Sequence, residues 1–351
     1  MIAPSAAEAA FREAAASRIL VKDGPYGTAI QKLALTEADY RGSFDLGHDQ
    51  KGNNDILNLT LPGAIAGIGR SYIEAGADLL ATNSFNANAI SQADYGAEGL
   101  VREINLAAAR ILRTEIDAAV AQDGVPRFLA GALGPTNKTL SLSPRVEDPG
   151  FREVDFDGVK AVYREQIDAL LDGGVDFILI ETVFDTLNAK AAAFAAMEAE
   201  EDRQKRVPIM LSMTLTDLAG RNLSGQTVEA FWISVKHTRP LTIGLNCSFG
   251  ATELRPHVQQ LAAQADALLM VYPNAGLPNA FGGYDELPQT TGGLIRQWAE
   301  AGLINAVGGC CGTTPAHIAE IAKAVEGLPP RPLPHPESAL RLSGLEAAIF
   351  A

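Results

Sequence analysis

The stretch "LLDGGVDFILIET", residues 170–182, contains the connection that decides the fold. A helical segment ends at a glycine, an aspartate follows two residues later, and an uninterrupted apolar run begins at once. The same junction occurs at Gly76, ahead of "LLATNS", and a looser copy is "AQADALLMV", residues 263–271. This repeat predicts helices that lead directly into buried strands.

Apolar runs of this kind recur along the whole chain, each leading into a polar or glycine-rich stretch. Their nearly continuous hydrophobicity is typical of parallel strands that are buried on both faces. The runs are "RILVKDG" from residue 18, "DLLATNS" from 78, "FLAGALGP" from 128, "DFILIET" from 176, "PIMLSMTL" from 208, "LTIGLNCS" from 241, "ALLMVYPN" from 267 and "INAVGGCC" from 304.

The segments between these runs have helical periodicity. One helix is predicted to start at Pro62 and to stop at Gly76, and another to start at Pro315 behind a Thr314 cap. The second helix would bury a stripe formed by Ile318, Ile321 and Val325.

Eight strands that alternate with helices, about forty residues apart, predict a single (β/α)8 TIM barrel of the α/β class. An open Rossmann-like sheet is the alternative, but no Gly-x-Gly-x-x-Gly or Walker motif supports nucleotide binding. We assign residues 1–328 to the barrel, with a leading helix within residues 1–20. Residues 329–351 contain "PPRPLPHPES" and are predicted to be an extended, proline-rich tail that resembles an interdomain linker.

Composition narrows the function classes. The 351 residues are 47% hydrophobic and 20% charged, which is typical of a globular protein with a large core. The net charge of −14 would repel nucleic acid and anionic membranes, so neither is an expected partner. No apolar segment approaches the roughly 20 residues of a membrane span. The amino terminus lacks a signal-peptide core, and three cysteines make a poor disulfide framework, so a cytoplasmic protein with reduced thiols is predicted.

The cysteines indicate the chemistry. Cys247 follows the sixth predicted strand, and Cys310 and Cys311 follow the eighth, so all three fall at the barrel end where reactive residues collect. Three thiolates with a free fourth position form a recognisable zinc arrangement, to which a thiol substrate could add. The alternative is that Cys247 is a small buried apolar residue and that the pair merely lies in a tight turn.

Three other residues at predicted strand ends are candidates for the same site. The amide oxygen of Asn274 could occupy the free metal position when no substrate is bound, although such an asparagine more often stabilises a turn. Asp23 and Glu181 could hold a ligand ammonium, or could simply accept local hydrogen bonds. His317, in the first turn of the last predicted helix, is expected to be a packed or solvated residue.

Six further motifs stand out along the chain: "KGNND", "GALGPTNKTLSLSP", "DFILIETVFDTLNAKAA", "GLNCSFG", "YPNAGLPNAFGGYD" and "VGGCCGTTPAHI". Together they closely resemble the homocysteine-binding module of cobalamin-dependent methionine synthase, and the likeness runs from about residue 18 to residue 328. The tail "RLSGLE", residues 341–346, is similar to the segment that leads from this module to the folate module.

The resemblance implies that Cys247, Cys310 and Cys311 hold zinc and that the homocysteine sulfur is the fourth ligand. It also implies that Asp23 and Glu181 hold the substrate ammonium. Zinc coordination would remove the thiol proton, and the thiolate would take the methyl group of methylcobalamin to give methionine.

Two features depart from the family pattern. After the first strand the family has Asp-Gly-Ala-Met-Gly-Thr, whereas this chain has Pro25 and Tyr26 at the third and fourth positions. Proline has no amide hydrogen, so donors to a substrate carboxylate must come from Tyr26 onward. The chain also stops where folate and cobalamin modules would begin, which predicts a split enzyme whose separate polypeptide supplies methylcobalamin.

Two other functions remain open at this point. One is a cobalamin-independent homocysteine S-methyltransferase that uses betaine or S-methylmethionine as methyl donor. The other is a noncatalytic subunit that binds zinc or thiols.

Overall fold

The structure is a computed structural model that describes residues 2–335 and 337–350. Its centre is one eight-stranded parallel sheet, as predicted, in the strand order β1-β8-β7-β6-β5-β4-β3-β2. The strands are β1 (Leu20–Val21), β2 (Leu79–Ala81), β3 (Phe128–Leu133), β4 (Phe177–Val183), β5 (Ile209–Met213), β6 (Thr242–Leu245), β7 (Leu268–Val271) and β8 (Ala306–Val307).

The two ends of this sheet meet, so it closes into a barrel. β1 pairs with β8 in the register Leu20 to Ala306. On its other side, a parallel bridge joins Lys22, which directly follows β1, to Leu79, the first residue of β2. The predicted (β/α)8 barrel is therefore confirmed, and the carboxyl ends of all eight strands lie at one mouth.

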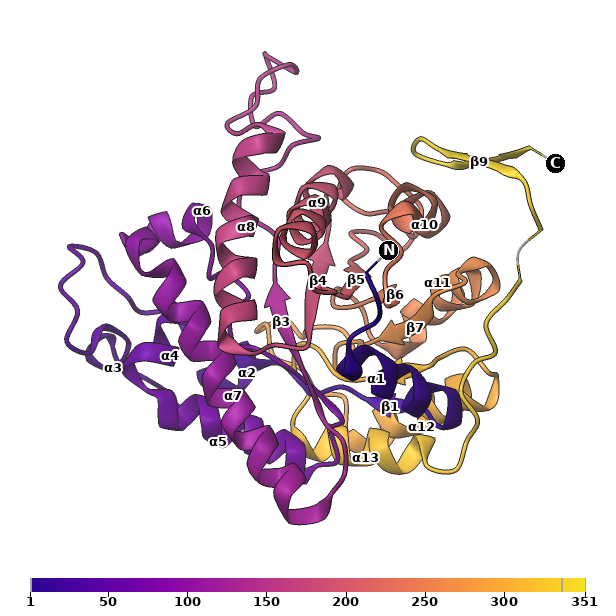
Figure 1. The fold of residues 1–351 in the computed structure, drawn as a ribbon, viewed down its shortest axis with the longest axis horizontal. Helices are drawn as coiled ribbons and strands as arrows, with labels where there is room; N and C mark the ends of the chain where they lie inside the picture. Colours follow the sequence, from indigo (N-terminus) through magenta and orange to yellow (C-terminus); the bar gives the residue numbers. More distant parts are fainter. Residues whose placement is uncertain (1, 336, 351) are drawn as a thin grey trace.

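Helices fill the connections and surround the barrel (Figure 1). The longer ones are α5 (Pro62–Glu74), α7 (Val101–Asp123), α8 (Phe156–Gly173), α9 (Thr186–Arg203), α10 (Val228–Val235), α11 (Ala251–Gln264), α12 (Pro288–Glu300) and α13 (Pro315–Val325). Shorter helical segments are α2 (Tyr26–Gln31), α3 (Glu37–Arg41), η1 (Asn54–Ile56), α4 (Leu57–Thr60), α6 (Ala89–Gln92), η2 (Ala93–Tyr95), η3 (Glu98–Leu100) and η4 (Lys236–Thr238).

Local sequence explains where these helices begin and end. α5 and α13 both start with proline at the first helical position, and Thr314 caps α13, as predicted. Gly76 and Gly174, with φ of +99° and +97°, lie in the repeated helix-to-strand junction. Glycine adopts this left-handed backbone without steric cost, which allows the chain to reverse directly into the next strand.

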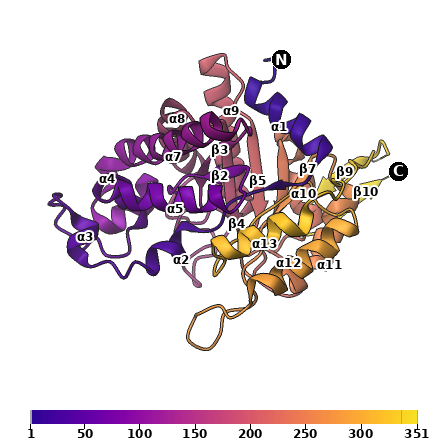
Figure 2. The ribbon, with the colours of Figure 1, turned by 90° about the horizontal axis from the view of Figure 1, so that it is seen from below.

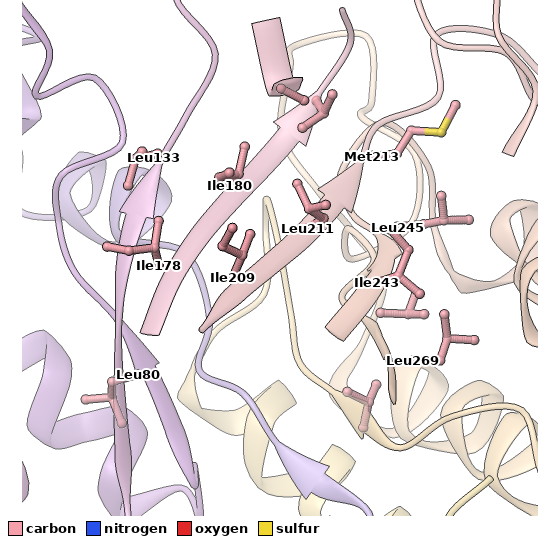
Figure 3. Packing of buried hydrophobic residues seen from close by; sticks show 14 of the residues in the cluster. Leu80, Leu133, Ile178, Ile180, Ile209, Leu211, Met213, Ile243, Leu245 and Leu269 are labelled. Carbon is pink, nitrogen blue, oxygen red and sulfur yellow. The ribbon is translucent and has the colours of Figure 1, made fainter. Parts of the chain in front are cut away.

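The core has two layers because each strand is buried on both faces. Outward-pointing side chains pack against the helices, and Figure 3 shows part of this layer. Its labelled members are Leu80, Leu133, Ile178, Ile180, Ile209, Leu211, Met213, Ile243, Leu245 and Leu269. The alternate side chains, such as Leu79, Phe128 and Leu179, fill the barrel interior. The unbroken apolar runs in the sequence follow from this double burial.

The leading helix α1 (Ala6–Ser17) closes the amino end of the barrel. Its Phe11 is fully buried and packs edge-on against Phe128 and Phe177, with ring centroids 5.2 Å away in both cases. Figure 2 shows α1 at one end of the molecule, while the orange loop between β7 and α12 projects from the opposite end. The carboxyl ends of the strands, at the opposite end from α1, face a cavity.

The tail contains structure that the sequence analysis did not predict. Arg331 is buried, and its guanidinium donates hydrogen bonds to the carbonyl oxygens of Ala262, Ala265 and Ala267. Beyond it, β9 (Leu340–Ser343) and β10 (Ala347–Phe350) form an antiparallel hairpin that lies beside α10 (Figure 1).

No helix within residues 2–335 and 337–350 is both long enough and apolar enough to cross a membrane.

Candidate metal and substrate site

A cavity of about 300 Å³ opens at the mouth of the barrel. Residues that follow β1, β6, β7 and β8 line it, together with the carboxyl end of β4 and the loops after β1 and β2. All three cysteines are among its lining residues. The sequence prediction that the cysteines share one barrel mouth is therefore confirmed.

The sulfur atoms of Cys247, Cys310 and Cys311 all lie within 4.8 Å of one another. The Sγ atoms of Cys247 and Cys311 are 3.9 Å apart. Three sulfurs that bind one tetrahedral zinc at about 2.3 Å must be about 3.8 Å apart, so the spacing fits such an ion.

Backbone hydrogen bonds hold the Cys310–Cys311 turn against the loop after β7. The Cys310 amide donates to the carbonyl oxygen of Pro273 at 2.8 Å, and the Ala275 amide donates to that of Cys311 at 3.0 Å. These two bonds fix both cysteines of the pair relative to the same neighbouring loop. The turn therefore presents both sulfurs to one cavity, which an extended strand would not do.

Glycines on either side of the pair permit this tight turn. A Cβ at Gly309 would lie 2.2 Å from the Thr313 hydroxyl oxygen. A Cβ at Gly312, where φ is +81°, would lie 2.3 Å from the Tyr284 side chain. Neither position has space for a larger residue, so the glycines are required by close packing.

Asn246 connects the cysteines to β4. It is almost completely buried, and its Oδ1 accepts hydrogen bonds from the Thr182 amide at 3.0 Å and the Ser212 hydroxyl at 2.7 Å. Its Nδ2 donates to the Thr182 hydroxyl at 2.8 Å and lies 3.9 Å from the Cys310 sulfur. Asn246 is therefore a rigid support behind the sulfur cluster.

Backbone strain is concentrated at the same place. Thr182, Cys247 and Ser248 all have positive φ, at 56°, 62° and 61°. Such a conformation is costly for residues with a Cβ, and particularly for a β-branched threonine. The hydrogen bonds of Asn246 hold Thr182 in this conformation, and the strained backbone sets the direction of the Cys247 sulfur.

The thiols influence each other's ionisation. Hydrogen bonds from the Cys247 and Cys310 thiols lower the pKa of Cys311 to about 3. The pKa of Cys310 is raised, because its thiol bonds to Cys247 and Cys311 and because the group is buried. Three ionised sulfurs this close would repel strongly, so full deprotonation of the cluster requires a cation.

Asn274 is buried, and its Oδ1 has no hydrogen-bond partner among the described residues. A buried, unpaired amide oxygen is unusual, since such groups nearly always have a partner. Its place after β7, between the strands that carry the cysteines, is the one the sequence analysis considered for an additional metal ligand.

Asp23 and Glu181 both lie at the mouth, but their surroundings differ. Asp23 is fully buried, and its two oxygens accept hydrogen bonds from Lys22 Nζ at 2.7 Å and the Ala81 amide at 2.9 Å. Glu181 lines the cavity, and its Oε2 accepts a hydrogen bond from the Tyr272 hydroxyl at 3.1 Å. Glu181 is thus the more accessible of the two carboxylates to a ligand.

Burial dominates the electrostatics of this acidic region. It raises the pKa of both Asp23 and Glu181, and the nearby Lys22 opposes the shift in each case. Burial also acts against the charged form of Lys22, but the carboxylates of Asp23 and Glu181 outweigh it and raise the Lys22 pKa. Lys22 therefore carries a positive charge at neutral pH.

Tyr26 begins α2, directly after Pro25. Its ring contacts the ring of Tyr72 edge-on at 6.4 Å between centroids, and its hydroxyl lies close to Gly69 on α5. The phenol is therefore part of the core, although Tyr26 also lines the cavity.

His317 has the packed role that the sequence analysis favoured. Its Nδ1 accepts a hydrogen bond from the Thr314 amide at 3.2 Å, and its Nε2 donates to the Glu286 carbonyl oxygen at 2.9 Å. The histidine thus ties the loop before α12 to the start of α13.

Four residues of the site were not predicted from the sequence: Lys22, Asn246, Tyr272 and Tyr284. Lys22 lines the cavity and Tyr284 donates a hydrogen bond to Cys311. One signal was present for Lys22, since a lysine within the apolar run "RILVKDG" requires a buried partner. Tyr284 lies in an irregular loop whose path over the sulfurs has no sequence pattern.

The fold and the site together define a class: a (β/α)8 barrel with a three-cysteine centre suited to a soft metal ion. The sequence model of the homocysteine S-methyltransferase family matches residues 20–325, and the chain belongs to that family. Family membership supports methyltransferase activity and agrees with homocysteine as substrate.

Solved structures agree with this assignment at the level of the fold. The homocysteine methyltransferase MmuM from Escherichia coli in its oxidised form is 22% identical, with a TM-score of 0.68 over 87% of this chain and 95% of that chain. Its metallated form is 23% identical, with the same TM-score over 87% and 96% of the two chains.

Proposed function

We propose that this protein is a zinc-dependent homocysteine S-methyltransferase that acts as one subunit of a split cobalamin-dependent methionine synthase. The observation that carries the proposal is the cluster of three sulfurs within 4.8 Å on the wall of the cavity. Family membership supports homocysteine as the substrate. The motifs shared with the cobalamin-dependent module support the identity of the methyl donor.

The residues present fit a zinc ion. Cys247, Cys310 and Cys311 would hold it, and the unpaired oxygen of Asn274 is a further candidate ligand in the absence of substrate. A zinc ion bound there would lower the pKa of an added thiol and supply a thiolate at neutral pH.

The protein's own residues would do the remaining work. Asn246 and the strained backbone at Cys247 hold the sulfurs in position before any ligand arrives. The buried walls exclude water from the substrate sulfur, and Glu181 offers a carboxylate to the substrate ammonium. Asp23 contributes to this acidic region from behind Lys22.

Zinc analysis tests the metal assignment. The chain has three cysteines, all in the cluster, so Cys310→Ser removes one sulfur with little change in volume. We expect about one zinc per wild-type chain after purification under reducing conditions, and loss of most of it in the variant. Ser143→Ala, in an exposed loop, is the control and should keep its zinc. Equal zinc content in all three proteins would contradict the assignment.

A donor assay tests the methyl source. The zinc-loaded protein and homocysteine would be mixed separately with methylcobalamin, betaine and S-methylmethionine, and methionine would be measured. The proposal predicts that, of the three donors, only methylcobalamin gives methionine. It also predicts faster turnover when a corrinoid-carrying partner is added. Efficient turnover from betaine or S-methylmethionine would favour the cobalamin-independent alternative, and zinc binding without any turnover would favour the noncatalytic one.

A further inference from the structure

Lys22 occupies an unusual position at the mouth of the barrel. Its side chain is only 4% exposed, yet it lines the cavity that contains the cysteines. Its ammonium contacts Asp23 Oδ1 at 2.7 Å. Asp23 itself is fully buried and is not among the lining residues. Lys22 therefore stands between the Asp23 carboxylate and any ligand in the cavity.

Besides Asp23, the Lys22 ammonium lies near Tyr272 and Glu181, which both line the cavity. Its Nζ lies 4.6 Å from the centroid of the Tyr272 ring, and the hydroxyl of that tyrosine bonds to Glu181 at 3.1 Å. The charges of Glu181 and Cys310 both act on Lys22. The ammonium of the buried Lys22 and the carboxylate of the partly buried Glu181 thus lie near each other, on the side of the cavity that carries the sulfurs.

We propose that Lys22 and Glu181 together read the head group of an α-amino-acid thiol, Lys22 binding its carboxylate and Glu181 its ammonium. This inference rests on the proposed function and adds a specificity-determining residue to it. An ammonium has three N–H donors, and Asp23 takes one of them. Pro25, in the loop after β1, has no amide hydrogen to donate to a carboxylate. The Lys22 ammonium supplies a donor in its place.

Charge balance explains why a zwitterion is the preferred ligand. A zwitterionic head group adds one positive and one negative charge, and each meets an opposite charge on the protein. A thiol that lacks either group would leave Lys22 or Glu181 without that partner in a largely buried site, which is costly.

Binding measurements with three thiols test the proposal. The zinc-loaded protein would be titrated calorimetrically with homocysteine, with 4-mercaptobutanoate, which lacks the amine, and with 3-aminopropanethiol, which lacks the carboxylate. For the wild type we expect homocysteine to bind at least about tenfold more tightly than either analogue, since a charged hydrogen bond is lost in each.

Two variants then separate the roles. Lys22→Met should lower the affinity for homocysteine about tenfold or more. The affinity for 3-aminopropanethiol should stay within about threefold of the wild-type value. Glu181→Gln should give the converse result: a lower affinity for homocysteine and a nearly unchanged affinity for 4-mercaptobutanoate. Because Lys22→Met leaves Asp23 buried without its cation, the double variant Lys22→Met with Asp23→Asn serves as the charge-balanced form.

Circular dichroism and zinc content would show that each variant is folded and loaded. Wild-type affinity for homocysteine in the double variant would overturn the proposal. An equal loss for all three thiols would also overturn it, because it would show a purely structural role for Lys22. These outcomes leave the proposed function intact, which fails instead if the wild-type protein binds neither zinc nor homocysteine.

Discussion

Asn246 shows how much of the site depends on a single buried side chain. It bonds to Thr182, whose backbone is strained, and it lies beside the Cys310 sulfur. A sequence gives the residue type, but not the rotamer that lets the Asn246 side chain bond to both β4 and β5. That rotamer is set by packing in the folded protein. The same holds for the orphaned oxygen of Asn274.

Replacing Asn246 with alanine should affect both stability and metal affinity. The Thr182 amide and the Ser212 hydroxyl would lose their acceptor, so the free energy of unfolding should fall by about 2–3 kcal/mol. Zinc affinity should fall about tenfold or more, as for other groups that orient metal ligands. Urea denaturation of the apoprotein and a competitive chelator titration measure the two effects. Asn137→Ala, at an exposed position, should change neither.

Asp55 gives a pH-dependent prediction. Its side chain is 3% exposed, and burial raises its pKa to about 7, against about 4 in the unfolded chain. Between pH 4 and pH 7 the native state therefore binds more protons than the unfolded state, and this contribution to stability is lost as pH rises through that window.

Asp55→Asn removes this penalty and keeps an acceptor for the Asn86 amide. We expect the variant to be more stable than wild type by about 2–4 kcal/mol at pH 8 and nearly equal to it at pH 4. Urea denaturation at the two pH values measures the difference. Asp49→Asn is the matched control, since that carboxylate is 92% exposed, and it should show no such pH-dependent gain. A constant difference at both pH values would contradict the assigned pKa.

At the scale of single elements, α1 is the one whose role was hardest to foresee. A leading helix was predicted, but nothing in an alanine-rich segment indicates which surface it covers. In the structure Phe11 enters the amino end of the barrel and meets Phe128 and Phe177. The helix therefore completes the inner core and is not an external addition.

Phe11→Ala should destabilise the whole barrel. The substitution removes a fully buried ring and leaves a cavity between β3 and β4, which typically costs about 3–5 kcal/mol. Thermal and urea unfolding measure the loss. Phe281→Ala, at a ring that is 98% exposed, should leave stability unchanged within about 0.5 kcal/mol. A similar small effect for both variants would show that α1 does not support the core.

At the scale of the whole molecule, the path of the chain after α13 decides what belongs to the barrel. Residues 329–351 were expected to be an extended tail, and among them Arg331 reaches into the core. The hairpin β9–β10 lies on the surface, where polar contacts from Arg221, Gln226, Thr227 and Ser234 hold it to the barrel. The tail thus consists of an anchored part and a superficial part.

Arg331→Met should therefore lower the free energy of unfolding much more than a substitution in the hairpin does. It would leave the carbonyl oxygens of Ala262, Ala265 and Ala267 without their donor, and we expect a loss of about 2–4 kcal/mol. Arg341→Met, on β9, is the control and should stay within about 0.5 kcal/mol of wild type. Urea denaturation of both variants checks the comparison, and equal stability would contradict the anchoring role.

The fold was predictable because burial of each strand leaves a local pattern in the sequence, namely the eight apolar runs and the Gly-x-Asp junctions that precede some of them. The meeting of Cys247 with Cys310 and Cys311 was predictable too, since barrel topology alone brings strand ends together. Lys22, Tyr272 and Tyr284 were not, because their contacts depend on side-chain direction and on an irregular loop. The hairpin was missed because its strands are short and expose apolar residues such as Leu340 and Phe350.

The pairing of β1 with β8 has a consequence for how this protein is made. The first strand leaves the ribosome almost three hundred residues ahead of the strand beside which it must lie. The barrel therefore cannot close before β8 is available to pair with β1, and Cys247 cannot meet Cys310 and Cys311 before that turn is in place. The sulfur cluster consequently forms only when the last strand of the barrel takes its place beside the first.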